Sequence, residues 1–251
     1  MVIGVPAQSP RVSVVLPVYN GGAHLHATIE SVLRQTMTEL ELVVVDDGST
    51  DNTLEIATSF ADPRISVIAL ESNVGLAEAL NRGIDQAKAG LIARQDSDDV
   101  SLPDRLSRQL ELFTREDSMV LAGTWASITR SLPGGNQQVV GQHRHPTTDA
   151  ELRFRLLWNN PFVHSSVVFR RDAFEAAGGY GTDPATSWPE DYDLWSRLMD
   201  FCTLANLPEV LVEYRQSPEG ISQLNQERMR SGVVRIASRN LAQATGRDSD
   251  D

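Results

Sequence analysis

The chain has 251 residues, of which 41% are hydrophobic and 22% are charged, and this balance excludes general disorder. Its formal net charge of −12 argues against nucleic acid as a partner, because such proteins need lysine and arginine to neutralise phosphates. The single cysteine, Cys202, excludes an intrachain disulfide and fits a reducing, cytoplasmic compartment. No stretch reaches the ~20 apolar residues that span a bilayer, so we expect no transmembrane segment and at most a peripheral membrane contact.

The first half of the chain alternates strand-like and helix-like segments. Four short, β-branched runs predict strands at residues 12–16, 40–45, 65–70 and 91–94. Amphipathic stretches between them predict helices at residues 23–35, 51–60 and 75–88. Such repeated strand–helix units predict an α/β protein with a parallel sheet and helices on both faces. A further helix is predicted to start near residue 101, with Ser101 as its cap and Pro103 in its first turn.

The second half lacks this rhythm, and we interpret it as a mixed lobe that covers one edge of the first. Strands are predicted at residues 120–129, 137–140, 166–169, 204–207 and 210–214, with a turn at 133–136. Helices are predicted at residues 149–158, 172–177, 190–199 and 223–242.

Acidic side chains follow two of the predicted strands. Asp96, Asp98 and Asp99 come directly after the strand at 91–94, where three carboxylates repel one another unless a divalent cation joins them. Mg²⁺ or Mn²⁺ suits such oxygen ligands together with phosphate. The alternative is a solvated acidic loop that caps the next helix. Asp47 is either part of an ordinary strand-to-helix turn or an acceptor of hydrogen bonds from a ligand.

Other polar or aromatic side chains also stand at predicted element ends. Tyr19 either offers its ring to a base or is a simple boundary residue, and His164 is either structural or part of a site. Glu190 and Asp191 open a predicted helix, where acidic groups suit the helix dipole, but the long loop before them could also place catalytic groups. No GxGxxG or GxxxxGK[ST] follows the first strand, which argues against a dinucleotide-binding fold and a P-loop NTPase.

Taken in order, several stretches resemble the inverting glycosyltransferases of family 2. The matching stretches are VSVVLPVYNGGAHLHATIESVLRQT, ELVVVDDGSTDNT, SNVGLAEALNRGIDQAKAGLIARQDSDDVSLPDRL, NPFVHSSVVFRR and AGGY followed by EDYDLWSRL. The resemblance covers residues 11–215. It implies the GT-A fold of nucleotide-diphospho-sugar transferases, with a mixed, mainly parallel sheet and helices on both faces.

The resemblance implies roles for residues on the donor side. Pro17, Tyr19 and Asp47 would frame the nucleotide base. Either Arg82 or Arg94 would approach the donor, and of the two we place Arg94 among the substrate-binding residues.

The resemblance also implies a metal site and a base. Asp96 and Asp98 would be the two ends of the family's DxD motif, with Asp98 holding Mn²⁺ or Mg²⁺, Asp99 sharing that role, and Asp96 facing the ribose or the donor. Asp191 matches the family's catalytic base. We also place His164 and Glu190 among the substrate-binding residues, and Glu190 is the rival of Asp191 as base.

The sequence therefore predicts a metal-dependent, inverting glycosyltransferase that moves one sugar from a nucleotide diphosphate donor to a saccharide or lipid-linked acceptor. We expect a role in surface glycan or glycolipid synthesis. The processive members carry a QxxRW motif and membrane helices that this sequence lacks. The alternatives are a sugar-1-phosphate nucleotidyltransferase and an inactive nucleotide-sugar binding domain. The predicted organisation is a lead-in, a nucleotide-sugar-binding lobe, an acceptor-side lobe, a C-terminal helix and a tail, at residues 1–10, 11–125, 126–220, 221–245 and 246–251.

Overall fold

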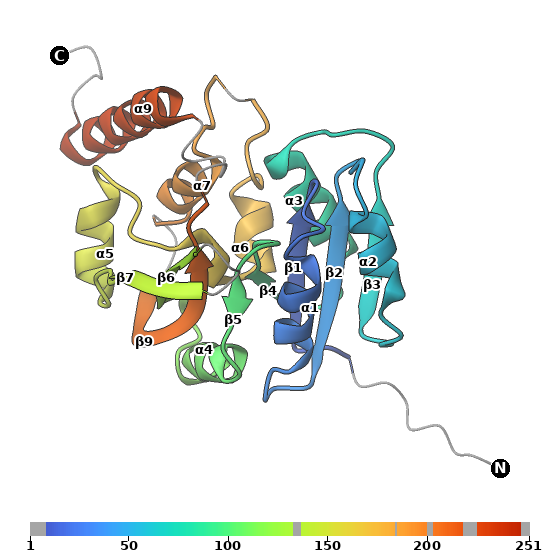
Figure 1. Cartoon of the computed structure of the whole chain (residues 1–251). Helices are drawn as coiled ribbons and strands as arrows, with labels where there is room; N and C mark the ends of the chain where they lie inside the picture. Colours follow the sequence, from blue (N-terminus) through green and yellow to red (C-terminus); the bar gives the residue numbers. More distant parts are fainter. Residues whose placement is uncertain (1–8, 133–136, 184, 200–202, 218–224, 247–251) are drawn as a thin grey trace.

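The computed structural model describes residues 9–132, 137–183, 185–199, 203–217 and 225–246. The predicted turn at 133–136, Cys202, and most of the predicted lead-in and tail lie outside these residues. One mixed sheet runs through the described part of the chain, and Figure 1 shows helices packed against both of its faces.

Strands from both halves of the sequence make up this sheet. They are β1 (Val12–Val18), β2 (Leu40–Asp46), β3 (Ile65–Ala69), β4 (Leu91–Arg94), β5 (Val100–Ser101), β6 (Met119–Ser131), β7 (Gln137–His143), β8 (Val168–Arg170) and β9 (Thr203–Arg215). Their order across the sheet is β3-β2-β1-β4-β8-β6-β9-β5, and β7 pairs with β6.

The helices fall between these strands. They are α1 (Leu25–Leu33), α2 (Thr53–Ser59), α3 (Leu76–Gln86), α4 (Arg105–Arg115), α5 (Asp149–Leu156), the 3₁₀ turn η1 (His164–Ser166), α6 (Arg171–Ala176), α7 (Glu190–Leu198) and α9 (Gln226–Thr245). The first three begin one or two residues later, and end one or two residues earlier, than the sequence predicts.

The parallel half of the sheet confirms the predicted strand–helix units. β1 pairs in parallel with both β2 and β4, and β2 pairs in parallel with β3. Pro17 was predicted to end the first strand, but β1 continues to Val18. Gln95 N–H donates to Val15 O and Asp47 N–H donates to Val18 O. The nitrogen of Pro17 therefore faces the β4 side beyond the end of β4, where no ladder hydrogen bond is lost.

The remaining strands join the sheet in mixed directions. β8 is antiparallel to both β4 and β6, whereas β9 is parallel to β6. The sequence predicted two strands at 204–207 and 210–214, but the structure has one strand with a register shift. Thr124 pairs with Leu207 and Trp125 with Val210, so Pro208 lies in a bulge, where a proline is tolerated.

The two predicted lobes share this continuous sheet. The predicted boundary between residues 125 and 126 falls within β6, and the antiparallel β4–β8 pair joins the parallel strands to the others. A ligand site at this junction is thus held from both sides by one sheet.

The start of α4 differs from the prediction. Ser101 lies in β5 and not at a helix cap, and the helix begins at Arg105 after Asp104. The Ser101 hydroxyl donates to Gln95 Oε1 and accepts from Arg105 Nη1, at 2.6 Å and 2.8 Å. These buried side-chain bonds compete with capping and draw Ser101 into the sheet.

Alternate residues of the central strands pack on opposite helical layers. Val14, Leu16 and Val18 lie in a core cluster with buried residues of α1, α2 and α4. Val15 lies in a second cluster with residues of α3, α5, α6, α7 and α9, including the fully buried Trp195. The predicted helices on both faces are confirmed.

Gln109 offers a test of how α4 is fastened to the sheet. Its Nε2 atom donates to Ala122 O at 2.6 Å and to Ser166 O at 2.8 Å, and the side chain is fully buried. We expect Gln109→Ala to lower the free energy of unfolding by about 2–6 kcal/mol, because each of the two buried carbonyls left without a donor costs about 1–3 kcal/mol. Urea unfolding measures this loss. Gln86→Ala on the exposed end of α3 is the control, and equal stabilities of the two variants would contradict the role of Gln109.

Candidate active site

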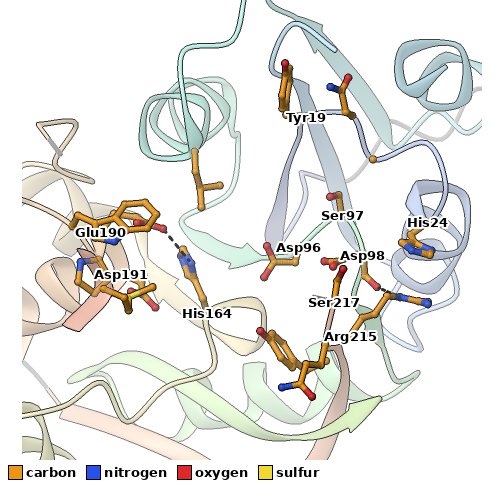
Figure 2. A pocket seen from close by; sticks show the side chains of 18 residues that line it. Tyr19, His24, Asp96, Ser97, Asp98, His164, Glu190, Asp191, Arg215 and Ser217 are labelled. Atoms are coloured by element: carbon orange, nitrogen blue, oxygen red, sulfur yellow. Dashed lines mark hydrogen bonds and ion pairs between the residues drawn. The ribbon is translucent and has the colours of Figure 1, made fainter. Parts of the chain in front are cut away.

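A pocket of about 370 Å³ lies where the segments after β1 and β4 meet the start of α7 and the end of β9 (Figure 2). It is lined by side chains from distant parts of the sequence: Tyr19, Asn20, Gly21, His24, Leu76, Asp96, Ser97, Asp98, His164, Trp188, Pro189, Glu190, Asp191, Tyr214, Arg215, Gln216, Ser217 and Met229. Residues that follow β1 and β4 thus meet at the carboxyl ends of these strands, where α/β sheets bind ligands.

The structure brings only some of the predicted site residues to this pocket. Six of them line it: Tyr19, Asp96, Asp98, His164, Glu190 and Asp191. Figure 2 shows His164, Glu190 and Asp191 on one side of the pocket, with Tyr19, Asp96 and Asp98 across from them. The other four do not line it: Pro17, Asp47, Arg94 and Asp99.

The acidic loop after β4 is held by a buried polar network. Arg105, from α4, donates to Gln95 Oε1 at 2.9 Å and to Arg94 O at 2.8 Å. From α1, the Thr28 hydroxyl lies 2.9 Å from both Ser97 O and Asp99 O. These contacts supply donors to buried backbone carbonyls of the loop, so its carboxylates have a fixed position at the pocket.

Asp98 is the carboxylate best placed for a cation. It lines the pocket, and burial together with the charge of Asp96 raises the pKa of Asp98 to about 6. A divalent cation would offset that repulsion. Among the described residues, no group of three histidine, cysteine or acidic side chains could hold a metal ion alone. The chemistry of Asp98 therefore fits a metal that takes its other ligands from water and substrate phosphates.

The carboxylates of Asp99 and Asp96 have different partners. Asp99 is fully buried, and its Oδ1 accepts the Arg215 N–H at 2.8 Å. A metal role for Asp99 stays a prediction, and this geometry does not favour it. Asp96 forms an ion pair with Arg94, whose side chain is 2% exposed beneath the pocket. Arg94 therefore acts on the pocket through Asp96 and through its charge.

The three residues predicted to frame the base are also placed differently from one another. Tyr19 is 50% exposed and lines the pocket, so its ring is available to a ligand. Asp47 is buried and accepts the backbone N–H groups of Val74 and Gly75 at 2.7 Å and 3.0 Å. Asp47 thus orders the loop before α3, while Pro17 lies within β1. Their predicted contacts with a base stay predictions.

Glu190 and Asp191 form the first turn of α7 at the opposite side of the pocket. Burial and the neighbouring Asp191 raise the pKa of Glu190 to about 7. Burial also raises the pKa of Asp191, although hydrogen bonds from the Tyr192 N–H and the Asn160 side chain oppose this shift. The site therefore holds two acidic groups whose pKa values are raised by burial, that of Glu190 to about 7.

His164 lies beside this acidic pair. Its Nε2 atom is 2.9 Å from the Tyr180 hydroxyl, and its Nδ1 atom is 4.0 Å from Glu190 Oε1. Burial lowers the pKa of His164 well below its ordinary value, and the Arg94 charge lowers it further. A neutral imidazole therefore separates the buried Tyr180 from Glu190.

Several lining residues were not predicted. Arg215, at the end of β9, donates from Nε to Asp98 O at 3.1 Å, and Tyr214, His24 and Trp188 also line the pocket. They carry no motif, and only the pairing of β9 with β5 and β6 brings Arg215 to the acidic loop.

No helix in the described part of the chain is long and apolar enough to cross a membrane.

The model of glycosyl transferase family 2 matches residues 13–178, more than half of the chain. The chain belongs to this glycosyltransferase family. The amylovoran biosynthesis glycosyltransferase AmsE of Erwinia amylovora is 32% identical to it, over 84% of this chain and 78% of AmsE. This membership decides against the nucleotidyltransferase alternative.

Two solved structures show that the fold is GT-A. Residues 1–349 of S. aureus TarS in complex with UDP-GlcNAc give a TM-score of 0.72 at 20% identity, over 92% of this chain and 66% of that chain. The mannosyltransferase PcManGT from Pyrobaculum calidifontis, with GDP-Man and Mn²⁺, gives 0.67 at 19% identity, over 95% of this chain and 65% of that chain. The chain thus spans about two thirds of these solved structures.

The raised pKa of Glu190 predicts a pH-dependent stability. The folded protein keeps a proton on Glu190 up to about pH 7, whereas the unfolded chain releases it near pH 4.5. The stabilisation from this protonated group is therefore complete below about pH 4.5 and is lost as the pH rises through 7. We expect Glu190→Gln to match the wild type at pH 4.5 and to exceed its unfolding free energy by up to about 3 kcal/mol at pH 8.

Urea unfolding at both pH values measures this difference. Glu55→Gln, on the exposed face of α2, is the matched control for loss of one carboxylate. A stability difference between wild type and Glu190→Gln that does not change with pH would show that folding does not raise the pKa of Glu190.

Proposed function

We propose that this protein is a metal-dependent, inverting glycosyltransferase that moves one sugar from a nucleotide diphosphate donor to an acceptor hydroxyl. The observation that carries the proposal is the placement of Asp98 and Asp191 on opposite sides of one pocket. An inverting displacement needs a leaving-group site and a base on opposite faces of the anomeric carbon. The family match supports the reaction class.

The transfer would take place in one step. The oxygen of the acceptor hydroxyl forms a bond to the anomeric carbon while its proton passes to Asp191. The bond from the anomeric carbon to the diphosphate oxygen breaks, and its electron pair leaves with the diphosphate. A positioned base of this kind contributes typically about 10²–10⁴-fold to the rate.

The leaving diphosphate would lie beside Asp96 and Asp98. Asp98 would hold Mg²⁺ or Mn²⁺ together with diphosphate oxygens, and the bound ion would neutralise charge that develops on the leaving group. Tyr19 would stack on the nucleotide base from its exposed position after β1. The complexes of TarS with UDP-GlcNAc and of PcManGT with GDP-Man and Mn²⁺ support such a donor and such a metal.

The acceptor side would come from the second half of the chain. We assign residues 11–125 to the donor lobe and residues 126–220 to the acceptor lobe, which contributes His164, Glu190 and Asp191 to the pocket. The acceptor would be a saccharide or a lipid-linked sugar in surface glycan or glycolipid synthesis, as the name of AmsE supports. The low cysteine content suits a cytoplasmic enzyme.

Asp98→Asn tests the metal site, because it keeps the shape of the side chain and removes its charge. We expect the affinity for a nucleoside diphosphate in Mn²⁺ to fall at least about tenfold, or about 1.4 kcal/mol. In EDTA the affinity should change less than twofold. Isothermal titration with UDP and GDP measures both values, with Asp85→Asn on the exposed face of α3 as control. Equal affinities of wild type and Asp98→Asn in Mn²⁺ would rule out the site.

Asp191→Asn tests the base. We expect donor binding and the melting temperature to stay unchanged while hydrolysis of the matching nucleotide sugar slows by about 10²–10⁴-fold. Screening a panel of nucleotide sugars with Mn²⁺ needs no acceptor, because water can take the place of the acceptor hydroxyl. A near wild-type rate in the variant would defeat the assignment. So would retention of anomeric configuration in the released sugar, read by NMR before mutarotation.

A further inference from the structure

Asn160 contacts the candidate base directly. It follows α5 in the chain, and its Nδ2 atom donates to Asp191 Oδ2 at 2.7 Å. Its Oδ1 atom accepts the backbone N–H of Phe162 at 3.0 Å. Since a backbone N–H can only donate, the amide must present oxygen to Phe162 and nitrogen to Asp191. The orientation of the Asn160 amide is thus fixed by the chain itself.

We propose that Asn160 is the positioning residue of the base: it holds Asp191 ionised and aimed into the pocket. This inference rests on the proposed function. The amide donates to one carboxylate oxygen, and the backbone N–H of Tyr192 donates to the other at 2.7 Å. Hydrogen bonds from two donors favour the charged carboxylate and fix the plane of the carboxyl group. Each oxygen keeps a lone pair for the proton of an attacking hydroxyl.

The same contacts make the ionised form more favourable for Asp191 than for its neighbour Glu190. Glu190 faces His164, whose ring is neutral and lies 4.0 Å from the nearest Glu190 oxygen. Asp191 instead accepts a hydrogen bond from the Asn160 amide, which favours the negative charge of the pair on Asp191. When only one of two close carboxylates is ionised, the one with the better donors carries the charge.

The remaining charged and titratable groups around Asp191 come from several elements. Arg94 at the end of β4 favours its ionised form, and the Glu190 carboxylate opposes it. Asp96 faces the same pocket, and His164 and Tyr180 are held neutral by burial. These groups act on Asp191 and Glu190 together, whereas the Asn160 amide contacts Asp191, so its removal isolates one interaction.

The test is the pH dependence of kcat for metal-supported hydrolysis of the nucleotide sugar by the full chain. We expect Asn160→Ala to move the rising limb of this profile up by about one to two pH units, because the ionised carboxylate loses a charge-assisted hydrogen bond. At pH values below the wild-type limb the rate should fall about 10–100-fold, while the KM for the donor changes less than twofold. At pH 9 most of the lost rate should return.

Two further variants make the result specific. Asn160→Asp keeps an acceptor for the Phe162 N–H but replaces the donor to Asp191, so it should shift the limb at least as far and serves if the alanine variant does not fold. Gln86→Ala, on the exposed end of α3, is the control and should leave the profile unchanged.

The possible outcomes distinguish a failure of this inference from a failure of the proposed function. A wild type that hydrolyses no nucleotide sugar, or an Asp191→Asn variant with wild-type rate, overturns the proposed function. If Asp191→Asn is inactive while Asn160→Ala and Asn160→Asp keep the wild-type limb and rate, Asn160 does not position the base. A uniform loss of rate at all pH values in both Asn160 variants would also overturn the inference.

Discussion

One buried guanidinium, that of Arg94, holds together an active site that would otherwise be a cluster of repelling acids. Burial raises the pKa of Asp98, Glu190 and Asp191, and the positive charge of Arg94 opposes that shift for all three. Arg94 lies at the end of β4, the strand that joins the parallel to the antiparallel strands. Its ion pair with Asp96 therefore places the positive charge where both sides of the pocket meet.

A second constraint is that another buried cation, Arg105, lies close to Arg94. Burial together with the charge of Arg94 lowers the pKa of Arg105 to about 9. Arg105 is surrounded by neutral acceptors, among them Gln95 Oε1, Arg94 O and Val167 O. These bonds fix the loop beneath the site, since moving it would leave the buried donors of Arg105 without partners.

The sequence predicted the parts of the fold that follow from local patterns. The alternation of strands and helices, the polar residues after β1 and β4, and the acidic first turn of α7 all have local signals. The strand boundaries predicted at Pro17 and Pro208 were wrong, because a proline costs no ladder hydrogen bond where its nitrogen faces no partner strand. Asp47 could not be placed, because its partners are backbone N–H groups 27 and 28 residues away. Asn160 and Arg215 gave no local signal either, since their contacts with the site arise from tertiary packing.

The charge balance of the pocket supports the proposed divalent cation. Asp96, Asp98, Glu190 and Asp191 line the pocket, whereas Arg215 is the arginine among its lining residues and Arg94 lies beneath. A nucleoside diphosphate would add further negative charge to this acidic pocket, within a chain whose net charge is −12. Arg215 donates to the backbone carbonyl of Asp98 and not to its carboxylate, so it leaves the charge of Asp98 unpaired toward the pocket. A divalent ion held by Asp98 would neutralise part of this charge when the diphosphate binds, and the neutral Asn160 amide orients Asp191 without adding negative charge.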